Sequence, residues 1–250
     1  MSAVRGKTLI VTGASRGIGR ALALALADAG ANLVLNARSQ GPLEEVVQAC
    51  RALGVQARGV AGSIAEAQTA EALVTAALEV GGFYGYIHNA GVLYPGPFVW
   101  ELPEAQFRAV LEVHLVGGYQ LARFAVPRLL EAGGGLAVYV GSGAAETNLP
   151  GIGAYAVAKA AEEHLAKQIA AEAPGLTCFV YRPGVVETRM QQEAREAQGS
   201  AAEALHQVFR GYQEQRVLLT PEQTAAALVR ILQREPERFH GGIATWRDGT

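Results

Sequence analysis

Short apolar runs alternate with longer stretches of helical periodicity along nearly the whole chain. The apolar runs contain few polar positions and predict strands at residues 8–12, 32–37, 55–60, 84–88, 136–140 and 176–181. Apolar residues at helical spacing predict helices at residues 19–29, 43–53, 66–79, 104–130 and 154–173. Strands that are apolar on both faces are typical of a parallel sheet covered by helices on each side. We therefore predict an α/β fold with a doubly wound parallel sheet.

The character of the chain changes after Pro183. Residues 187–215 are polar with helical periodicity, and a final strand is expected after them. Thr220 followed by Pro221 predicts the start of another helix, because threonine caps helix N-termini and proline fits the first turn. No linker rich in proline or serine divides the chain. We expect one domain over residues 1–250, in which the segment at about 187–215 covers the substrate.

Composition narrows the possible functions. Half of the residues are hydrophobic, 18% are charged and the net charge is −2, so no basic surface is predicted for nucleic acid. Cys50 and Cys178 lack the spacing of metal ligands, and we expect two reduced thiols and no metal. The N-terminus does not resemble a signal peptide, and no apolar stretch reaches the roughly 18 residues that span a bilayer. These features favour a cytoplasmic protein without a membrane partner.

A glycine-rich turn follows the first predicted strand. Gly13, Gly17 and Gly19 allow a sharp turn and a close approach of backbone to a pyrophosphate. The next helix offers free N–H groups and the positive end of its dipole to the phosphates. Ser15, Arg16 and Ile18 lie in the same turn. Strand, turn and helix in this order predict a Rossmann-type dinucleotide site.

The end of the second strand distinguishes between two dinucleotides. Sites for NAD usually place an acid here, which accepts hydrogen bonds from the ribose 2′-hydroxyl. This chain has Arg38 instead, and a guanidinium binds a 2′-phosphate through two charge-assisted hydrogen bonds. Arg16 could reach the same phosphate from the glycine turn. The predicted cofactor is therefore NADP(H).

Three residues form a candidate catalytic centre. Tyr155 and Lys159 are four residues apart, which places them on one face of a helix, and Ser142 follows the strand predicted just upstream. A free tyrosine has a pKa of about 10, too high for acid–base work near neutral pH. A neighbouring ammonium and an oxidised nicotinamide ring would both favour the phenolate. Ser142 could hold a carbonyl oxygen while Tyr155 donates the proton.

Together these motifs resemble the short-chain dehydrogenase/reductase family, in its branch of about 250 residues. The resemblance rests on TGxxxGxG at 12–19, Asn89-Ala90-Gly91, Ser142, the Tyr155/Lys159 pair and PGxxxT at 183–188. It implies hydride transfer from C4 of the nicotinamide, with Lys159 on the nicotinamide ribose, Asn89 on the adenosine side and Thr188 at the carboxamide. By the same resemblance, the cofactor also contacts Ser63, Ala90, Gly91, Tyr155, Pro183, Gly184 and Val186.

Within the family, residues 183–196 and 239–248 are similar to sepiapterin reductases and to benzil-reductase-like proteins. Three positions depart from the expected pattern. His114 falls where the family has a catalytic asparagine that holds a water of the proton relay, and Ser63 replaces an acid that meets adenine. The aspartate that anchors the pterin in sepiapterin reductases falls on Thr245 or Trp246, with Asp248 the only acid nearby.

The substrate is expected to be a small, apolar carbonyl compound. Apolar residues that should border its pocket are Leu93, Tyr94, Trp100, Leu149 and Met190. The leading hypothesis is an NADP(H)-dependent reductase of a ketone, a diketone or a pterin-like carbonyl. The alternatives are a 3-oxoacyl-carrier-protein reductase and a dinucleotide sensor without catalysis, although such sensors typically lose the tyrosine or the lysine. The resemblance also implies a homodimer or homotetramer formed by the helices at 104–130 and 154–173.

Overall fold

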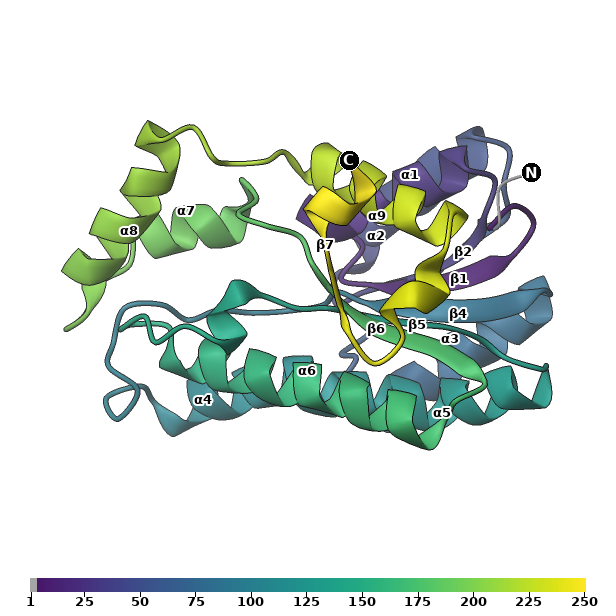
Figure 1. The fold of residues 1–250 in the computed structure, drawn as a ribbon, viewed down its shortest axis with the longest axis horizontal. Helices are drawn as coiled ribbons and strands as arrows, with labels where there is room; N and C mark the ends of the chain where they lie inside the picture. The colour runs from purple at the N-terminus through teal and green to yellow at the C-terminus, as the bar shows by residue number, and fades with distance from the viewer. Residues whose placement is uncertain (1–3) are drawn as a thin grey trace.

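The computed structural model describes residues 4–250, and within them seven strands form one parallel sheet (Figure 1). The strands are β1 (Thr8–Thr12), β2 (Asn32–Ala37), β3 (Ala57–Ala61), β4 (Phe83–His88), β5 (Gly135–Val140), β6 (Leu176–Arg182) and β7 (Ile243–Thr245). Their order across the sheet is β3-β2-β1-β4-β5-β6-β7. Strand order reverses between β1 and β4, and such a point opens a crevice at the carboxyl ends of the strands. The predicted fold class is confirmed.

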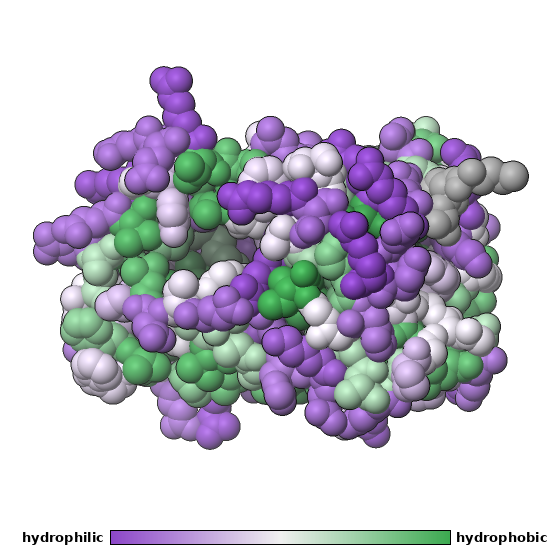
Figure 2. All heavy atoms as spheres, in the orientation of Figure 1, coloured by the Kyte–Doolittle hydropathy of each residue, from purple (hydrophilic) through white to green (hydrophobic). Residues whose placement is uncertain are grey.

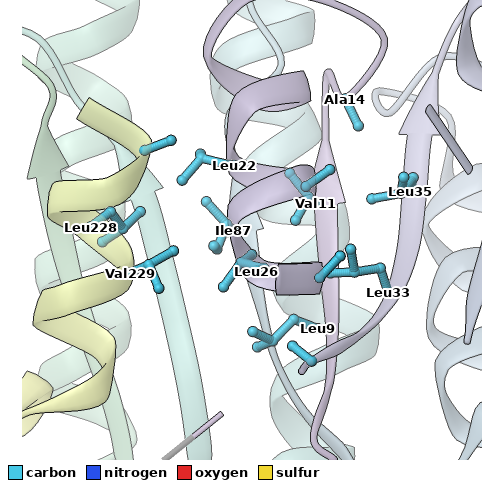
Figure 3. Close-up of a cluster of buried hydrophobic side chains, with 14 of the residues drawn as sticks. Leu9, Val11, Ala14, Leu22, Leu26, Leu33, Leu35, Ile87, Leu228 and Val229 are labelled. Carbon is cyan, nitrogen blue, oxygen red and sulfur yellow. The ribbon is translucent and has the colours of Figure 1, made fainter. Parts of the chain in front are cut away.

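Helices cover both faces of the sheet (Figure 1). One face carries α1 (Gly17–Asp28), α2 (Gln40–Ala52) and α9 (Pro221–Gln233), and the other carries α3 (Ala67–Val80), α5 (Gly117–Glu131) and α6 (Gly153–Glu172). Figure 3 shows the first layer, where Leu9 and Val11 of β1 belong to one apolar cluster with Leu22 of α1 and Leu228 of α9. Ile10 points to the opposite layer. Strand residues therefore alternate between two apolar cores, as a sheet buried on both faces requires.

Most predicted elements are present with small shifts at their ends. Thr220 caps α9 as expected: its side chain accepts the N–H of Gln223, whose side chain accepts the N–H of Thr220 in return. Strand β3 begins two residues later than predicted and is largely exposed. It lies at the edge of the sheet, where only one neighbour defines its ends.

The helix predicted at residues 104–130 is interrupted. Helix α4 (Glu104–Leu111) passes into a π-helical turn at Glu112–Val116, from which α5 continues. Gly117 and Gly118 follow this turn and bring the backbone close to β4 and β5, since a Cβ at Gly118 would lie 2.9 Å from the Tyr139 ring. Such turns occur frequently at functional sites, and this one holds the buried His114.

The polar segment at 187–215 forms α7 (Arg189–Arg195) and α8 (Ala202–Glu214), which stand beyond the carboxyl ends of the strands (Figure 1). Gly96 ties this segment to the rest of the chain: its carbonyl accepts the N–H of Ala201, and its N–H donates to the carbonyl of Gly151, both at 2.9 Å. A Cβ at Gly96 would lie 2.0 Å from the carbonyl oxygen of Gln198. Three loops therefore meet at this glycine.

Short 3-10 helices at Gly143–Ala145, Pro236–Phe239 and Trp246–Gly249 complete the described elements. Within residues 4–250, no helix combines the length and the apolar character needed to cross a membrane.

Candidate active site

A cavity of about 820 Å³ lies at the carboxyl ends of the strands, bordered by α7. Figure 2 shows the molecule in the orientation of Figure 1, with a recess in its left half that is bordered in part by hydrophobic residues. Most of the predicted site residues line the cavity: Gly13, Ser15, Arg16, Gly17, Ile18, Arg38, Ser63, Asn89, Ala90, Gly91, Leu93, Tyr94, His114, Tyr155, Lys159, Pro183, Thr188 and Met190. The fold thus brings the glycine turn, the arginines and the Tyr155/Lys159 pair to one place.

Close contacts explain the glycine turn. Gly13 has a φ of +65°, and a Cβ there would lie 2.8 Å from the Cα of Ala90. Gly19 does not line the cavity: it leaves room for Asn89, whose Nδ2 would lie 2.6 Å from a Cβ at that position. Asn89 Nδ2 donates to the carbonyl of Thr12 at 3.0 Å. Asn89 therefore joins the ends of β1 and β4, in the space that the absence of a side chain at Gly19 leaves open.

Two arginines in the lining of the cavity have no ion-pair partner among residues 4–250. Arg16 and Arg38 are exposed, and neither forms an ion pair with any residue from 4 to 250. Arg16 immediately precedes α1, whose first N–H groups face the turn. A tight glycine turn, a helix N-terminus and two unpaired guanidinium groups together fit the phosphates of a dinucleotide.

Tyr155 and Lys159 lie one turn apart on α6. Lys159 is buried, and its Nζ donates to the carbonyl of Val140 at 2.6 Å and to Oε2 of Glu162 at 2.7 Å. Burial, the largest single cause, would lower the pKa of Lys159, but the attraction of Glu162, Tyr155 and Glu163 together outweighs it and raises this pKa above its usual value. Since an ammonium has three N–H groups, one remains for a ligand in the cavity.

Ser142 does not line the cavity but lies at its edge, directly after Gly141, which does. Its Oγ accepts the N–H of Ala144, so the hydroxyl proton is available for donation. Its backbone N–H donates to Oε1 of Glu163 at 3.1 Å, and Arg182 binds the same carboxylate at 2.7 and 2.9 Å. Glu163 and Arg182, which the sequence analysis did not identify, thus fix the Ser142 loop on α6.

A buried polar cluster lies behind Lys159. Oε2 of Glu162 lies 3.5 Å from Nδ1 of His114, and Oε1 lies 3.8 Å from Nε2 of His88. Burial opposes the charge of Glu162, yet the Lys159 ammonium and the imidazoles of His114 and His88 together lower the pKa of this carboxyl to about 2. Burial lowers the pKa of His88 to about 4 and that of His114 below its usual value. At neutral pH the cluster holds one cation, one anion and two neutral imidazoles.

The hydrogen bonds of His88 define its tautomer. Thr12 Oγ1 accepts the N–H groups of Asn89 and Ala90, so its own hydroxyl donates to Nδ1 of His88 at 3.1 Å. Nε2 therefore carries the proton and donates to the carbonyl of His114 at 3.1 Å. This imidazole is locked in place and supports the π-helical turn. Neither His88 nor Glu162 was identified from the sequence.

Several predicted residues lie outside the cavity lining. Trp100 is 77% exposed and stacks on Phe98 with ring centroids 5.0 Å apart. Leu149 packs in an apolar cluster with Leu93 and Met190. Gly184 and Val186 also lie outside the lining. At Gly184 a Cβ would meet the ring of Trp246 at 2.7 Å, so this glycine makes room for the C-terminal segment.

The C-terminal segment does not supply a group to the cavity. Asp248 accepts hydrogen bonds from the N–H and the hydroxyl of Thr245 at 2.7 and 2.8 Å, and so caps its own turn. Neither Thr245 nor Trp246 lines the cavity. The acid nearest to the expected pterin anchor is therefore committed to a local structural role.

Comparison with known proteins establishes the family. The sequence profile described as short chain dehydrogenase matches residues 7–199. An uncharacterised oxidoreductase from Saccharomyces cerevisiae is 30% identical over 249 residues, covering 97% of this chain and 96% of that protein. The L-rhamnose 1-dehydrogenase (NAD(P)+) from Sphingomonas is 31% identical over 258 residues, covering 100% of this chain and 97% of that protein. The chain belongs to the short-chain dehydrogenase/reductase family.

Solved structures agree with this assignment. The L-sorbose reductase from Gluconobacter frateurii, in complex with NADPH and L-sorbose, has a TM-score of 0.85 and 25% identity, with 98% of this chain and 97% of that chain covered. An alcohol dehydrogenase from Thermococcus sibiricus, in complex with 5-hydroxy-NADP, has a TM-score of 0.80 and 28% identity, with coverage of 96% and 95%. The protein is an oxidoreductase that uses a nicotinamide dinucleotide. The subgroup resemblance seen in the sequence stays a prediction.

Proposed function

We propose that this protein is an NADPH-dependent reductase of small carbonyl compounds. The observation that carries the proposal is the meeting of Tyr155 and Lys159 with two unpaired arginines at one cavity. Strand β2 ends at Ala37 and Arg38 follows it, at the position where sites for NAD usually have an acid. Substrate would enter beneath α7, so that the segment at 187–215 covers it.

Ser142, Tyr155 and Lys159 have separate roles in the proposed reduction. NADPH, when bound, supplies a hydride from C4 of its nicotinamide ring. Ser142 donates its hydroxyl proton in a hydrogen bond to the carbonyl oxygen, and Tyr155 transfers its own proton to that oxygen as the carbon accepts the hydride. Two N–H groups of Lys159 bind Val140 and Glu162, and the third would bind the hydroxyls of the nicotinamide ribose. Carbonyl, hydride and proton give the alcohol, and Tyr155 is left as phenolate.

We expect NADPH to be preferred over NADH in kcat/KM, and Arg38→Ala to remove most of that preference. Loss of a charge-assisted bidentate contact should cost about 1.5–3 kcal/mol, or roughly 10- to 100-fold in kcat/KM with NADPH. Activity with NADH should hardly change. Steady-state kinetics with both cofactors will measure this, with Arg20→Ala as a control, since Arg20 is exposed on α1 and does not line the cavity. Equal use of the two cofactors by the unaltered protein would contradict the assignment.

We expect benzil-like diketones to exceed sepiapterin in kcat/KM by at least about tenfold, a difference of only about 1.4 kcal/mol. Leu93 and Met190 give the substrate end of the cavity an apolar wall, whereas Asp248 caps its own turn and cannot anchor a pterin. NADPH consumption will be measured with benzil, sepiapterin and an acetoacetyl thioester in parallel. A preference for sepiapterin would require another pterin anchor, and a preference for the thioester would favour the 3-oxoacyl-carrier-protein reductase.

We also propose a homodimer or homotetramer formed through α5 and α6. Tyr119 and Leu130 on α5 are 49% and 42% exposed, and Val157 on α6 is 50% exposed. Apolar side chains of this size on two helices favour a protein interface there. The cytoplasmic location expected from the sequence stays a prediction.

A further inference from the structure

Glu162 is a buried carboxylate that takes no part in the proposed transfer of hydride and proton. Its side chain is fully buried, yet Oε1 has no hydrogen-bond partner within residues 4–250. Oε2 binds the Lys159 ammonium at 2.7 Å. A buried, partly unsatisfied carboxylate costs stability, and apolar residues in place of a buried ion pair are often neutral or stabilising. Packing alone therefore gives no reason for a charge at this position.

The charge balance around Lys159 gives such a reason. The groups that face this region are His88 from β4, His114 from the π-helical turn, Tyr139 from β5, and Tyr155, Lys159 and Glu163 from α6. The charge of Glu163 is matched by Arg182, and both imidazoles are neutral near pH 7. Glu162 is thus the anion that directly balances Lys159.

This balance acts on Tyr155. The Lys159 Nζ lies 5.9 Å from the centroid of the Tyr155 ring, and an unbalanced ammonium at that distance would favour the phenolate. Glu162 lies three residues after Lys159 on α6, one turn farther from Tyr155, and its charge opposes that effect. The edge of the neutral His114 ring, whose centroid is 5.3 Å from that of Tyr155, adds no charge.

We propose that Glu162 is a positioning residue that balances the charge of Lys159 beside Tyr155, and so adapts the site to carbonyl reduction. This inference rests on the proposed function. In reduction, the Tyr155 O–H bond breaks and its proton joins the substrate oxygen, while the carbonyl carbon gains a hydride. Alcohol oxidation needs the reverse, a phenolate that accepts a proton. The equilibrium of the reaction is unchanged, and what Glu162 sets is the pH range in which each direction proceeds.

The test is Glu162→Gln, which keeps the shape and removes the charge. We expect the alkaline limb of the pH profile of kcat/KM for reduction to move about one pH unit lower, because the carboxylate no longer disfavours a second negative charge on the neighbouring phenol. Glu162→Asp moves the carboxylate away from Nζ and should give a smaller shift in the same direction. Glu172→Gln is the matched control, because it removes a carboxylate from the exposed end of α6. Its profile should match that of the unaltered protein.

A second measurement does not depend on turnover. Tyrosinate absorbance will be titrated in the cofactor-free proteins, with and without Glu162→Gln, and the titration of the corresponding Tyr155→Phe protein subtracted from each. The Gln variant should form the Tyr155 phenolate at lower pH. If the Gln variant loses stability while neither the alkaline limb of kcat/KM nor the tyrosinate titration moves, Glu162 has only a structural role. If the alkaline limb moves while the pH at which tyrosinate forms does not, Lys159 is the titrating group. That result also overturns the proposal.

The two measurements separate this inference from the proposed function. If no carbonyl compound is reduced, the proposed function fails, and the tyrosinate titration alone decides whether Glu162 acts on Tyr155. If the Gln variant does not fold, the Asp variant decides by the same two measurements, and an unchanged limb and titration overturn the inference.

Discussion

Replacing Tyr155 by phenylalanine lowers kcat by about 100-fold or more, while NADPH binding stays nearly intact. The hydroxyl is the proton donor of the proposed reaction, and a positioned general acid contributes on this scale. The ring that remains keeps its edge contact with His114, so the cavity should not rearrange. Single-turnover kinetics will measure the chemical step, and a fluorescence titration with NADPH will measure binding.

Tyr119→Phe is the control for this change, because Tyr119 is a half-exposed tyrosine on α5 that does not line the cavity. It should retain full activity. Substantial turnover by the Tyr155→Phe protein on any good substrate would rule out Tyr155 as the proton donor.

Replacing Lys159 by methionine lowers the free energy of unfolding by about 3–5 kcal/mol, in addition to its effect on activity. The change leaves Glu162 fully buried without its cation, and removal of one partner of a buried ion pair has a cost of this order. Urea unfolding at pH 7 will measure the loss. Turnover and NADPH binding should both fall, since Lys159 is also the proposed ligand of the nicotinamide ribose.

The double variant Lys159→Met/Glu162→Met separates stability from activity. With both charges gone, most of the lost stability should return, because apolar residues can replace a buried pair. Turnover should not return. Recovery of both together, or of neither, would contradict the role assigned to this pair.

Local signals explain why much of the fold was predictable. Apolar runs and helical periodicity located the strands and most helices, because a sheet buried on both faces leaves few polar positions in its strands. Thr220 and Pro221 located the start of α9 through capping chemistry. The ends of β3 were less accurate, since an exposed edge strand has a weak apolar pattern.

The glycine turn, the arginines and the Tyr155/Lys159 pair were named from the sequence and line one cavity, because each lies at the start or the end of an element that could be predicted. The π-helical turn was not found, since a single histidine leaves the helical pattern around it unchanged. Trp100 and Leu149 were predicted at the pocket from their place in the chain, but contacts between loops decide where such side chains point.

Glu162 is a different case, because a usable signal was present. It lies at spacings of four between Ala158 and Ala166, both buried, and so falls on the inner face of α6. It is also three residues after Lys159. The periodicity of the helix thus predicts an inward carboxylate next to the lysine, although nothing in the sequence places His88 and His114 beside it.

The junction at Gly96 bears on how this enzyme can be redesigned. The loop that contains Gly96, the turn at Gly151 and the start of α8 share backbone hydrogen bonds and leave no space for a side chain at that glycine. Exchange of α7 and α8 alone for those of a relative would break contacts that the other two loops require. A chimaera with altered substrate range must therefore carry all three segments together, as one transferable unit.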